Sequence, residues 1–476
     1  MKLNKRIITV MVTVLALFLV LVGYLTYFTV FRAPEIIKSN HNPRIWEREK
    51  KILRGTIYDR AGVVLAESKK DGDNQERVYP YGSIYAHTIG YNNRNYGKTN
   101  IESQFNDYLM KTPSVIDVLR KDTAEDEGEE DPLTKGANLS LTLDHSMTQL
   151  AAQLMGNDHG SVVALNPVTG EVYCLYSSPT FDPNEAKLTE NWDELTERSD
   201  SPFFPRATQG LYAPGSTFKV VTAAAGIDEG HENFTFNDKG KTTVGGKPFR
   251  NAGGKAYGQI DMSDAIRVSS NVFFTQLSQV IGKDALREKA KDFCVMKKVP
   301  FDIPTNAADG VFDDIDNAEL GSVAIGQGKL RVSPFNMALV ASAIANDGVI
   351  MRPYMVEEAF FEDGESVYNA TPEALSRATS SRAAAMIKEY MVGCVRGGTG
   401  TAAKVPGIDV AGKTGTAENE RKGKTHAWFI GFAPADNPQL AICVMKEYSG
   451  HGGGSVCAPI AAKLIQNALN SGLITR

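Results

Sequence analysis

The feature that most limits how this chain can fold is an uncharged run of 25 residues from Ile7 to Phe31. As a helix rising about 1.5 Å per residue, the run would measure roughly 37 Å, enough to cross a bilayer with some tilt. It exceeds the usual signal-peptide core of about 7–15 residues, and no A-x-A-like cleavage site follows it. We therefore expect residues 7–31 to be a single-pass anchor in the cell membrane. Lys2, Lys5 and Arg6 precede the run, which favours a cytoplasmic N-terminus and an extracytoplasmic body.

Length and charge limit what the rest of the chain can be. The 476 residues are too many for one small core, so we expect two or three domains. The net charge of -5, without a basic stripe, argues against a nucleic-acid partner. The segment from Asp122 to Asp131 is acidic and poor in apolar residues, as solvated linkers are. We place a pedestal domain at residues 33–136 and a larger domain at residues 137–476.

The five cysteines are widely spaced along the chain and form no C-x-x-C pair. This pattern predicts buried apolar thiols and argues against both a disulfide framework and a zinc site. No cluster of side chains has metal-ligand spacing. We therefore expect neither a metal nor a cofactor.

Short strands and amphipathic helices succeed one another along the chain. Residues 54–68 have the pattern of two strands around a turn, and residues 160–178 that of a hairpin. Towards the end, residues 441–448 read as a strand and residues 458–469 as an amphipathic helix. These elements predict an α+β fold in which helices sandwich an antiparallel sheet, with a small β-rich N-terminal pedestal and one transmembrane helix.

Residues 407–415, GIDVAGKTG, match the phosphate-loop pattern G-x-x-x-x-G-K-[ST]. A phosphate loop needs a helix that begins directly after the Lys-Thr pair, because the helix N-terminus directs amide dipoles at the phosphates. Here a polar turn comes next, followed by a strand-like segment at residues 426–432. The pattern therefore predicts a hairpin whose first strand covers residues 409–417, and we expect no nucleotide.

Three short motifs occur in order along the larger domain. They are S-x-x-K at Ser216–Lys219, S-x-N at Ser269–Asn271 and K-T-G at Lys413–Gly415, at spacings of about 50 and 140 residues. Serine acyl-transferases use these motifs together, with the Lys-Thr-Gly strand as one wall of the active site. Each triplet alone is weak evidence, but the ordered set predicts one catalytic cleft.

The S-x-x-K spacing suits an activated serine. Residues 216–226 are predicted to form a buried helix, with Ser216 at its N-terminus and the amine of Lys219, one turn on, able to face the hydroxyl. A serine hydroxyl needs a base to take its proton, and a lysine is a base only when neutral. Burial and a second nearby cation both lower a lysine pKa, and Lys413 could be that cation. We expect Ser216 to be the nucleophile and Lys219 the acylation base.

The chain resembles the class B penicillin-binding proteins, which are membrane-anchored peptidoglycan transpeptidases, over nearly its full length. RGTIYDRAGVVLA at residues 54–66 resembles the pedestal motif R-G-x-I-x-D-R-x-G of that family. Other characteristic stretches lie at residues 162–184, 212–219, 265–271, 324–334 and 410–418. The resemblance implies the penicillin-binding, serine β-lactamase-like transpeptidase fold for the larger domain.

The resemblance also implies a reaction. Ser216 would attack the penultimate D-Ala carbonyl of a peptidoglycan peptide stem ending in D-Ala-D-Ala and release the terminal D-Ala. An amine of a neighbouring stem would then take the acyl group, and β-lactam antibiotics would acylate Ser216 as mimics of the dipeptide. Ser269 would relay a proton to the leaving amine, while Asn271 would bind the substrate amide and help to fix Lys219.

On the K-T-G strand, the resemblance implies that Lys413, Thr414 and Thr416 receive the carboxylate of the terminal residue. Gly415 would let the substrate backbone lie close against the strand. The backbone N–H groups of Ser216 and Thr416 would form the oxyanion hole. A polytopic glycan polymerase in the membrane is the partner that the resemblance implies.

Two other functions fit the same motifs. The first is a hydrolase, a D,D-carboxypeptidase or β-lactamase, which would transfer the acyl group to water. The second is a non-enzymatic β-lactam sensor or scaffold. A pedestal and an anchor favour the transpeptidase, because destruction of a drug needs neither. Only six residues precede the anchor, too few for a cytoplasmic signalling domain.

Overall fold

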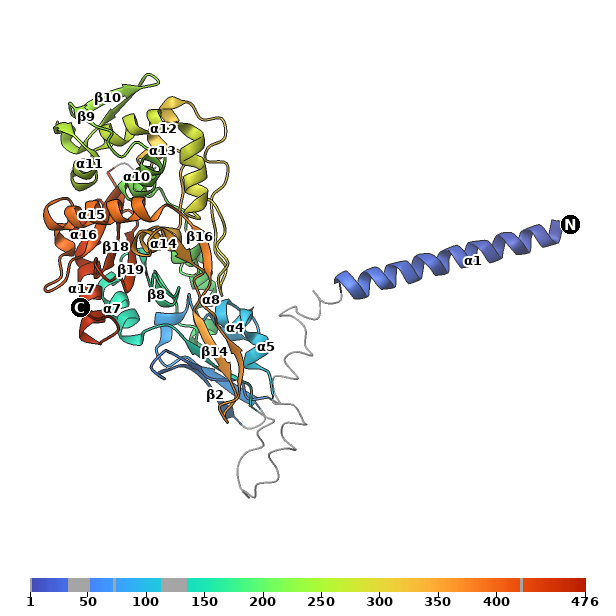
Figure 1. Cartoon of the computed structure of the whole chain (residues 1–476). Helices are drawn as coiled ribbons and strands as arrows, with labels where there is room; N and C mark the ends of the chain where they lie inside the picture. Colours follow the sequence, from blue (N-terminus) through green and yellow to red (C-terminus); the bar gives the residue numbers. More distant parts are fainter. Residues whose placement is uncertain (1, 33–51, 72–73, 113–134, 420–422) are drawn as a thin grey trace.

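The computed structural model describes residues 2–32, 52–71, 74–112, 135–419 and 423–476 (Figure 1). Helix α1 (Lys2–Tyr27) continues as a π-helical turn to Arg32. In this part of the chain it is the one helix long and apolar enough to cross a membrane, as the sequence predicts. The predicted acidic linker at residues 122–131 and the start of the predicted pedestal lie outside the described residues.

A five-stranded antiparallel sheet with the order β17-β18-β19-β7-β8 forms the centre of the larger part of the chain. Its strands are β17 (Ala411–Glu418), β18 (Thr425–Ala433), β19 (Leu440–Lys446), β7 (Gly160–Leu165) and β8 (Val172–Ser178). The hairpin predicted at residues 160–178 and the strand predicted at residues 441–448 are confirmed. The Lys-Thr-Gly hairpin is confirmed as well, because β17 pairs directly with β18.

Helices cover both faces of this sheet, which gives the predicted sandwich. Successive residues of a strand point to opposite faces. In β19, Cys443 therefore joins the hydrophobic cluster that contains α14 (Pro334–Ala345), whereas Ile442 joins the cluster that contains α7 (His145–Met155) and α17 (Ala458–Asn470). All five cysteines are buried free thiols, as predicted. Strand β17 contacts α15 (Ser381–Gly397).

A six-stranded sheet with the order β15-β14-β6-β1-β2-β3 lies at the lower end of the body in Figure 1. Its strands are β15 (Ser366–Asn369), β14 (Val356–Phe360), β6 (Asn138–Leu141), β1 (Ile57–Tyr58), β2 (Val64–Asp71) and β3 (Asn74–Val78). Strand β6 pairs in parallel with β1 and antiparallel with β14. The sheet thus includes strands from both sides of residue 136. Two short helices, α4 (Asn100–Gln104) and α5 (Asn106–Leu109), lie between β3 and β6 in the chain.

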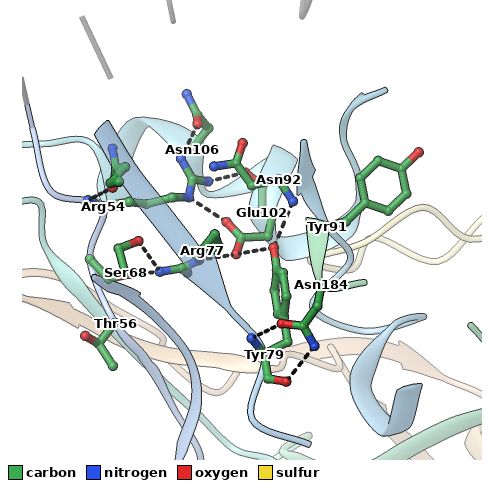
Figure 2. Close-up of polar contacts among 12 residues, drawn as sticks. Arg54, Thr56, Ser68, Arg77, Tyr79, Tyr91, Asn92, Glu102, Asn106 and Asn184 are labelled. Atoms are coloured by element: carbon green, nitrogen blue, oxygen red, sulfur yellow. Dashed lines mark hydrogen bonds and ion pairs between the residues drawn. The ribbon is translucent and has the colours of Figure 1, made fainter. Parts of the chain in front are cut away.

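A buried ion-pair network holds the pedestal together (Figure 2). The carboxylate of Glu102 lies between two arginines: Oε2 accepts from Arg54 Nε at 2.6 Å, and Oε1 accepts from Arg77 Nε at 2.7 Å. Tyr79 OH donates to the same Oε1 at 3.1 Å. Arg54 is the first residue of the R-G-x-I-x-D-R-x-G motif, and its guanidinium is neutralised by Glu102 inside the pedestal.

Hydrogen bonds of Tyr79 and Asp59 join the pedestal to the rest of the chain. The backbone N–H of Tyr79 donates to Asn184 Oδ1 at 2.9 Å, and Asn184 Nδ2 donates to Tyr79 O at 3.1 Å, just before α8 (Glu185–Glu197). Asp59, in the same motif, accepts from the backbone N–H of His145 at 3.2 Å and so contacts the start of α7. These residues of the N-terminal part therefore bind segments after residue 137 through hydrogen bonds that involve backbone groups.

A helical lobe lies at the opposite end of the body from the six-stranded sheet (Figure 1). It contains α10 (Lys219–Asp228), α11 (Met262–Val268), α12 (Asn271–Asp292) and α13 (Asn317–Ala324). Two small hairpins complete it: β10 (Lys241–Val244) with β11 (Lys247–Arg250), and β9 (Phe236–Asp238) with β12 (Gly258–Ile260). The S-x-x-K and S-x-N motifs stand on this lobe, and the K-T-G motif stands on the sheet.

Candidate active site

The segment that carries Ser216 is a three-ten turn, Gly215–Phe218, followed directly by α10. The helix predicted from residue 216 therefore begins with a three-ten turn, and the α-helix itself begins at Lys219. The cause is Gly215, which adopts a left-handed φ of 55° and donates its N–H to Gly326 O at 2.9 Å. A Cβ at Gly215 would lie 2.7 Å from Thr416 O, so only glycine lets the turn approach β17 this closely. The Ser216 side chain is partly exposed to the cleft.

The amine of Lys219 is fully buried and lies against the S-x-N turn. Its Nζ donates to Asn271 Oδ1 at 2.7 Å and to Ser269 O at 2.8 Å, and it lies 3.3 Å from Ser269 Oγ. Burial lowers the pKa of Lys219 well below its ordinary value, and repulsion by Lys413 lowers it further. The neutral state that a base requires is thus favoured by the two causes that the sequence predicts.

The sequence predicts that the Lys219 amine can face the Ser216 hydroxyl, but no hydrogen bond joins the two side chains in the structure. The Ser216 hydroxyl makes no hydrogen bond with another residue in the described ranges, because the Lys219 amine is directed at residues 269–271. Catalytic hydrogen bonds are commonly long in unliganded sites and shorten when substrate binds. The two residues nevertheless follow one another on consecutive helical segments, three positions apart.

Lys413 joins the K-T-G strand to the S-x-N turn. Its Nζ is fully buried and donates to Ser269 Oγ at 2.9 Å and to Thr414 O at 3.0 Å. Burial lowers the pKa of Lys413 as well. A neutral Lys219 would give its two protons to the carbonyl oxygens of Ser269 and Asn271, which leaves its lone pair to accept from the Ser269 hydroxyl. Ser269 Oγ then stands between two amines and can pass a proton in either direction.

Local backbone geometry sets the S-x-N turn. Ser269 ends α11 in a left-handed conformation with φ 61°, and Ser270 caps α12 by accepting from the N–H of Phe273 at 3.0 Å. The chain thus reverses between two helices within two residues. Asn271 Nδ2 donates to Arg250 O at 2.8 Å, which fixes the amide with its oxygen toward Lys219.

The K-T-G motif lies within β17, the edge strand of the five-stranded sheet. Lys413 pairs with Ile430 and Gly415 with Trp428 in an unbroken antiparallel register, so no helix begins after the Lys-Thr pair. A Cβ at Gly415 would lie 2.8 Å from Pro214 O. Glycine is therefore required here by the turn that carries Ser216, a reason that the sequence does not reveal.

These segments border one cleft of about 1100 Å³. Six of the eight residues predicted from the sequence line it: Ser216, Ser269, Asn271, Thr414, Gly415 and Thr416. Lys219 and Lys413 lie buried behind this surface. Within the described ranges, no three His, Cys, Asp or Glu side chains form a group that could hold a metal ion.

The cleft also contains residues that the sequence reasoning missed. Thr399 is in the loop after α15, and its Oγ1 lies 2.6 Å from Thr414 Oγ1. Gln327, within the family-like stretch at residues 324–334, lines the cleft, and so do Gly452 and Gly454. No spacing rule identifies Thr399, Gly452 or Gly454, since each reaches the site through the fold alone.

Residues 160–466 match the family described as the penicillin binding protein transpeptidase domain. Residues 54–124 match the family described as the penicillin binding protein A dimerisation domain. The chain is 32% identical to the peptidoglycan D,D-transpeptidase PbpA of Mycolicibacterium smegmatis, over 98% of this chain and 100% of that protein.

Solved structures agree with these matches. Penicillin-binding protein A from M. tuberculosis, solved as a ceftriaxone acyl-enzyme complex, superposes with a TM-score of 0.81 at 31% identity, over 88% of this chain and 99% of that one. The D,D-transpeptidase domain of a peptidoglycan glycosyltransferase from Eggerthella lenta superposes with a TM-score of 0.79 at 33% identity, covering 89% and 100% of the two chains.

Proposed function

The chain belongs to the penicillin-binding-protein transpeptidase family, and from that premise we propose that it is a serine-type peptidoglycan D,D-transpeptidase. It cross-links peptide stems through an acyl-enzyme, releases terminal D-Ala and is acylated by β-lactams. The observation that carries the proposal is the hydrogen-bonded chain from Lys413 through Ser269 to Lys219, beside a partly exposed serine at the cleft surface.

In the first step, Ser216 Oγ attacks the carbonyl carbon of the penultimate D-Ala, and its proton passes to the neutral amine of Lys219. Such proton transfer by a positioned base contributes roughly 10²–10⁴-fold to rate. The lowered pKa of Lys219, caused by burial and then by Lys413, supports this role. Substrate in the cleft brings the hydroxyl and the amine into contact.

When the tetrahedral intermediate collapses, the C–N bond to the terminal D-Ala breaks and the leaving amine needs a proton. Ser269 Oγ gives up its proton to that amine and regains one from Lys413 or Lys219, since both amines contact it. Asn271 binds the substrate amide from the same turn. A stem amine then attacks the acyl carbon and gives up a proton to Lys219. The C–O bond breaks, and Lys219 returns the proton to the Ser216 oxygen.

Strand β17 supplies the binding surface for the terminal residue. As an edge strand, it offers backbone groups that an extended peptide can pair with, as in β-strand addition. Lys413, Thr414 and Thr416 receive the carboxylate, and Gly415 keeps the strand close to the serine turn. The backbone N–H groups of Ser216 and Thr416 form the oxyanion hole, where one such donor is worth about 3–4 kcal/mol.

The same proposal extends to the whole chain. Residues 7–31 anchor it in the cell membrane with the N-terminus in the cytoplasm, residues 33–136 form the pedestal, and residues 137–476 form the catalytic domain outside. The apolar helix α1 supports the anchor. A polytopic glycan polymerase is the partner that we propose for the anchor and pedestal.

The test uses the full chain in detergent micelles, a stem peptide that ends in D-Ala-D-Ala and a graded concentration of an amine acceptor. Released D-Ala, amide product and hydrolysed product are quantified together. We expect the amide product to grow with acceptor concentration and Ser216→Ala to release no D-Ala. Transfer of the acyl group to water alone would assign the chain to the carboxypeptidases, and D-Ala release by Ser216→Ala would exclude the mechanism.

A further inference from the structure

A buried carboxylate stands directly behind the S-x-N turn. Asp238, the last residue of β9, is fully buried. Its Oδ1 accepts from the N–H of Gly240 at 2.7 Å, and its Oδ2 accepts from the hydroxyl of Ser270 at 2.6 Å. Asn251 Nδ2 lies 2.9 Å from Oδ1 and 2.7 Å from Oδ2. The carboxylate thus contacts the middle residue of the motif whose outer residues contact Lys219.

Asn251 connects the same carboxylate to the start of α12. Its Oδ1 accepts from the backbone N–H groups of Asn271 at 2.9 Å and of Val272 at 3.1 Å. Its Nδ2 also donates to Lys255 O at 2.9 Å. Asp238 and Asn251 therefore fix the position of the Asn271 backbone. The side chain of Asn271 in turn accepts from the Lys219 amine through Oδ1.

The charge of Asp238 has no ion-pair partner within 4.0 Å among the residues that the structure describes. An ionised group in such surroundings needs a nearby opposite charge as well as hydrogen bonds. The charged groups that act on Lys219 are Lys413 of β17, which lowers its pKa after burial does, and Asp238 of β9, which raises it. Cys394 of α15 acts on Lys413, and Asp238 also acts on Tyr257, before β12.

We propose that Asp238 is a positioning residue, whose carboxylate holds the Ser269–Asn271 turn and supplies a negative charge that acts on Lys219 against the charge of Lys413. This inference rests on the proposed function, because it assigns Asp238 a task in the same acyl transfer. The pKa of Lys219 then depends on two buried charges of opposite sign, those of Lys413 and Asp238. After burial, Lys413 lowers the pKa of Lys219, and Asp238 opposes that lowering.

The experiment measures the second-order rate constant for acylation by a fluorescent penicillin, with the full chain in detergent micelles, from pH 5 to pH 10. In the wild type the rate rises with pH as Lys219 loses its proton. In Asp238→Asn the negative charge is gone, so the rise moves to lower pH, by about half a unit or more. The asparagine oxygen can still accept from Gly240 and Asn251, and its amide can donate to the Ser270 hydroxyl, so only the contact of Asn251 Nδ2 with the second carboxylate oxygen is lost.

Ser270→Ala is the control, because it removes the hydrogen bond to Asp238 and the cap of α12 while leaving the charge of Asp238 in place. We expect a lower rate at every pH and an unshifted rise. Asp238→Ser, also neutral, gives the same expected shift if the asparagine variant does not fold. A neutral variant with its rise at the wild-type pH would overturn the inference while leaving the proposed function intact. Failure of the wild type to be acylated would instead refute the proposed function.

Discussion

Replacing Glu102 with glutamine removes the carboxylate that two buried arginines share in the pedestal. Glu102, Arg54 and Arg77 are at most 5% exposed, so water cannot compensate the arginines. The glutamine keeps nearly the same shape and one acceptor oxygen. The substitution therefore changes the charge while leaving the packing of the network in Figure 2 almost unchanged.

Two routes give the size of the effect. Burial would raise the pKa of Glu102, but Arg54 and Arg77 together outweigh it and lower the pKa from 4.5 to about 2. At about 1.4 kcal/mol per pKa unit, that depression corresponds to about 3 kcal/mol of stability at pH 7. Removal of one partner from a buried ion pair typically costs about 3–5 kcal/mol. Both routes predict a loss of about 3 kcal/mol.

The pH dependence follows from the sign of the shift. A carboxyl whose pKa is lower in the folded chain stabilises it fully above the unfolded value of 4.5 and progressively less as pH falls toward 2. The difference in stability between wild type and Glu102→Gln should therefore be largest at pH 7 and shrink to roughly 1 kcal/mol at pH 3.

Hydrogen exchange of the full chain, read by mass spectrometry on peptides that cover β1 to β3, measures this gap locally. We expect these amides to exchange on the order of 100-fold faster in Glu102→Gln at pH 7, and about 10-fold faster at pH 3. Glu76→Gln, at an exposed position of β3, is the control and should exchange like wild type. Equal exchange in Glu102→Gln and wild type, or a gap that does not change with pH, would refute the reasoning.

Three further predictions concern the catalytic domain. Lys219→Arg should lower the acylation rate by at least about 10²-fold, since arginine stays protonated; acylation at the wild-type rate would exclude Lys219 as the base. Thr399→Val loses the hydrogen bond to Thr414, worth about 1 kcal/mol, so acylation should slow about five-fold, and an unchanged rate would remove Thr399 from the site. Gly453→Ala should lower the midpoint of thermal unfolding, because the added Cβ would overlap a backbone carbonyl. Gly393→Ala, in α15 with open space around it, should leave the midpoint unchanged. Equal midpoints for the two variants would contradict this prediction.

The elements with a periodic pattern or a motif could be predicted from the sequence. Strand β17 was predictable because a polar turn and a strand follow the Lys-Thr-Gly triplet and exclude a helix. The proximity of the buried Lys219 and Lys413 side chains was predictable, because both residues belong to motifs of one cleft. The three-ten turn before α10 was not, because the close approach of Gly215 to Thr416 is a tertiary contact without a local signature.

The remaining site residues depend on contacts between distant segments. Asp238 and Ser270 are 32 positions apart, and no spacing rule brings a strand end to a helix cap. Thr399 reaches Thr414 because the loop after α15 returns along β17. The six-stranded sheet likewise takes β14 and β15 from residues 356–369, which follow the pedestal by more than 200 positions. Such long-range pairings are set by the whole fold and not by local pattern.

The convergence of the three motifs on Ser216 is tested most directly by mass spectrometry of the full chain after brief exposure to benzylpenicillin. Peptide mapping should find one covalent adduct per chain, on the peptide that contains Ser216, and none in a folded Ser216→Ala variant. An adduct on another residue, or one that persists in Ser216→Ala, would contradict the account.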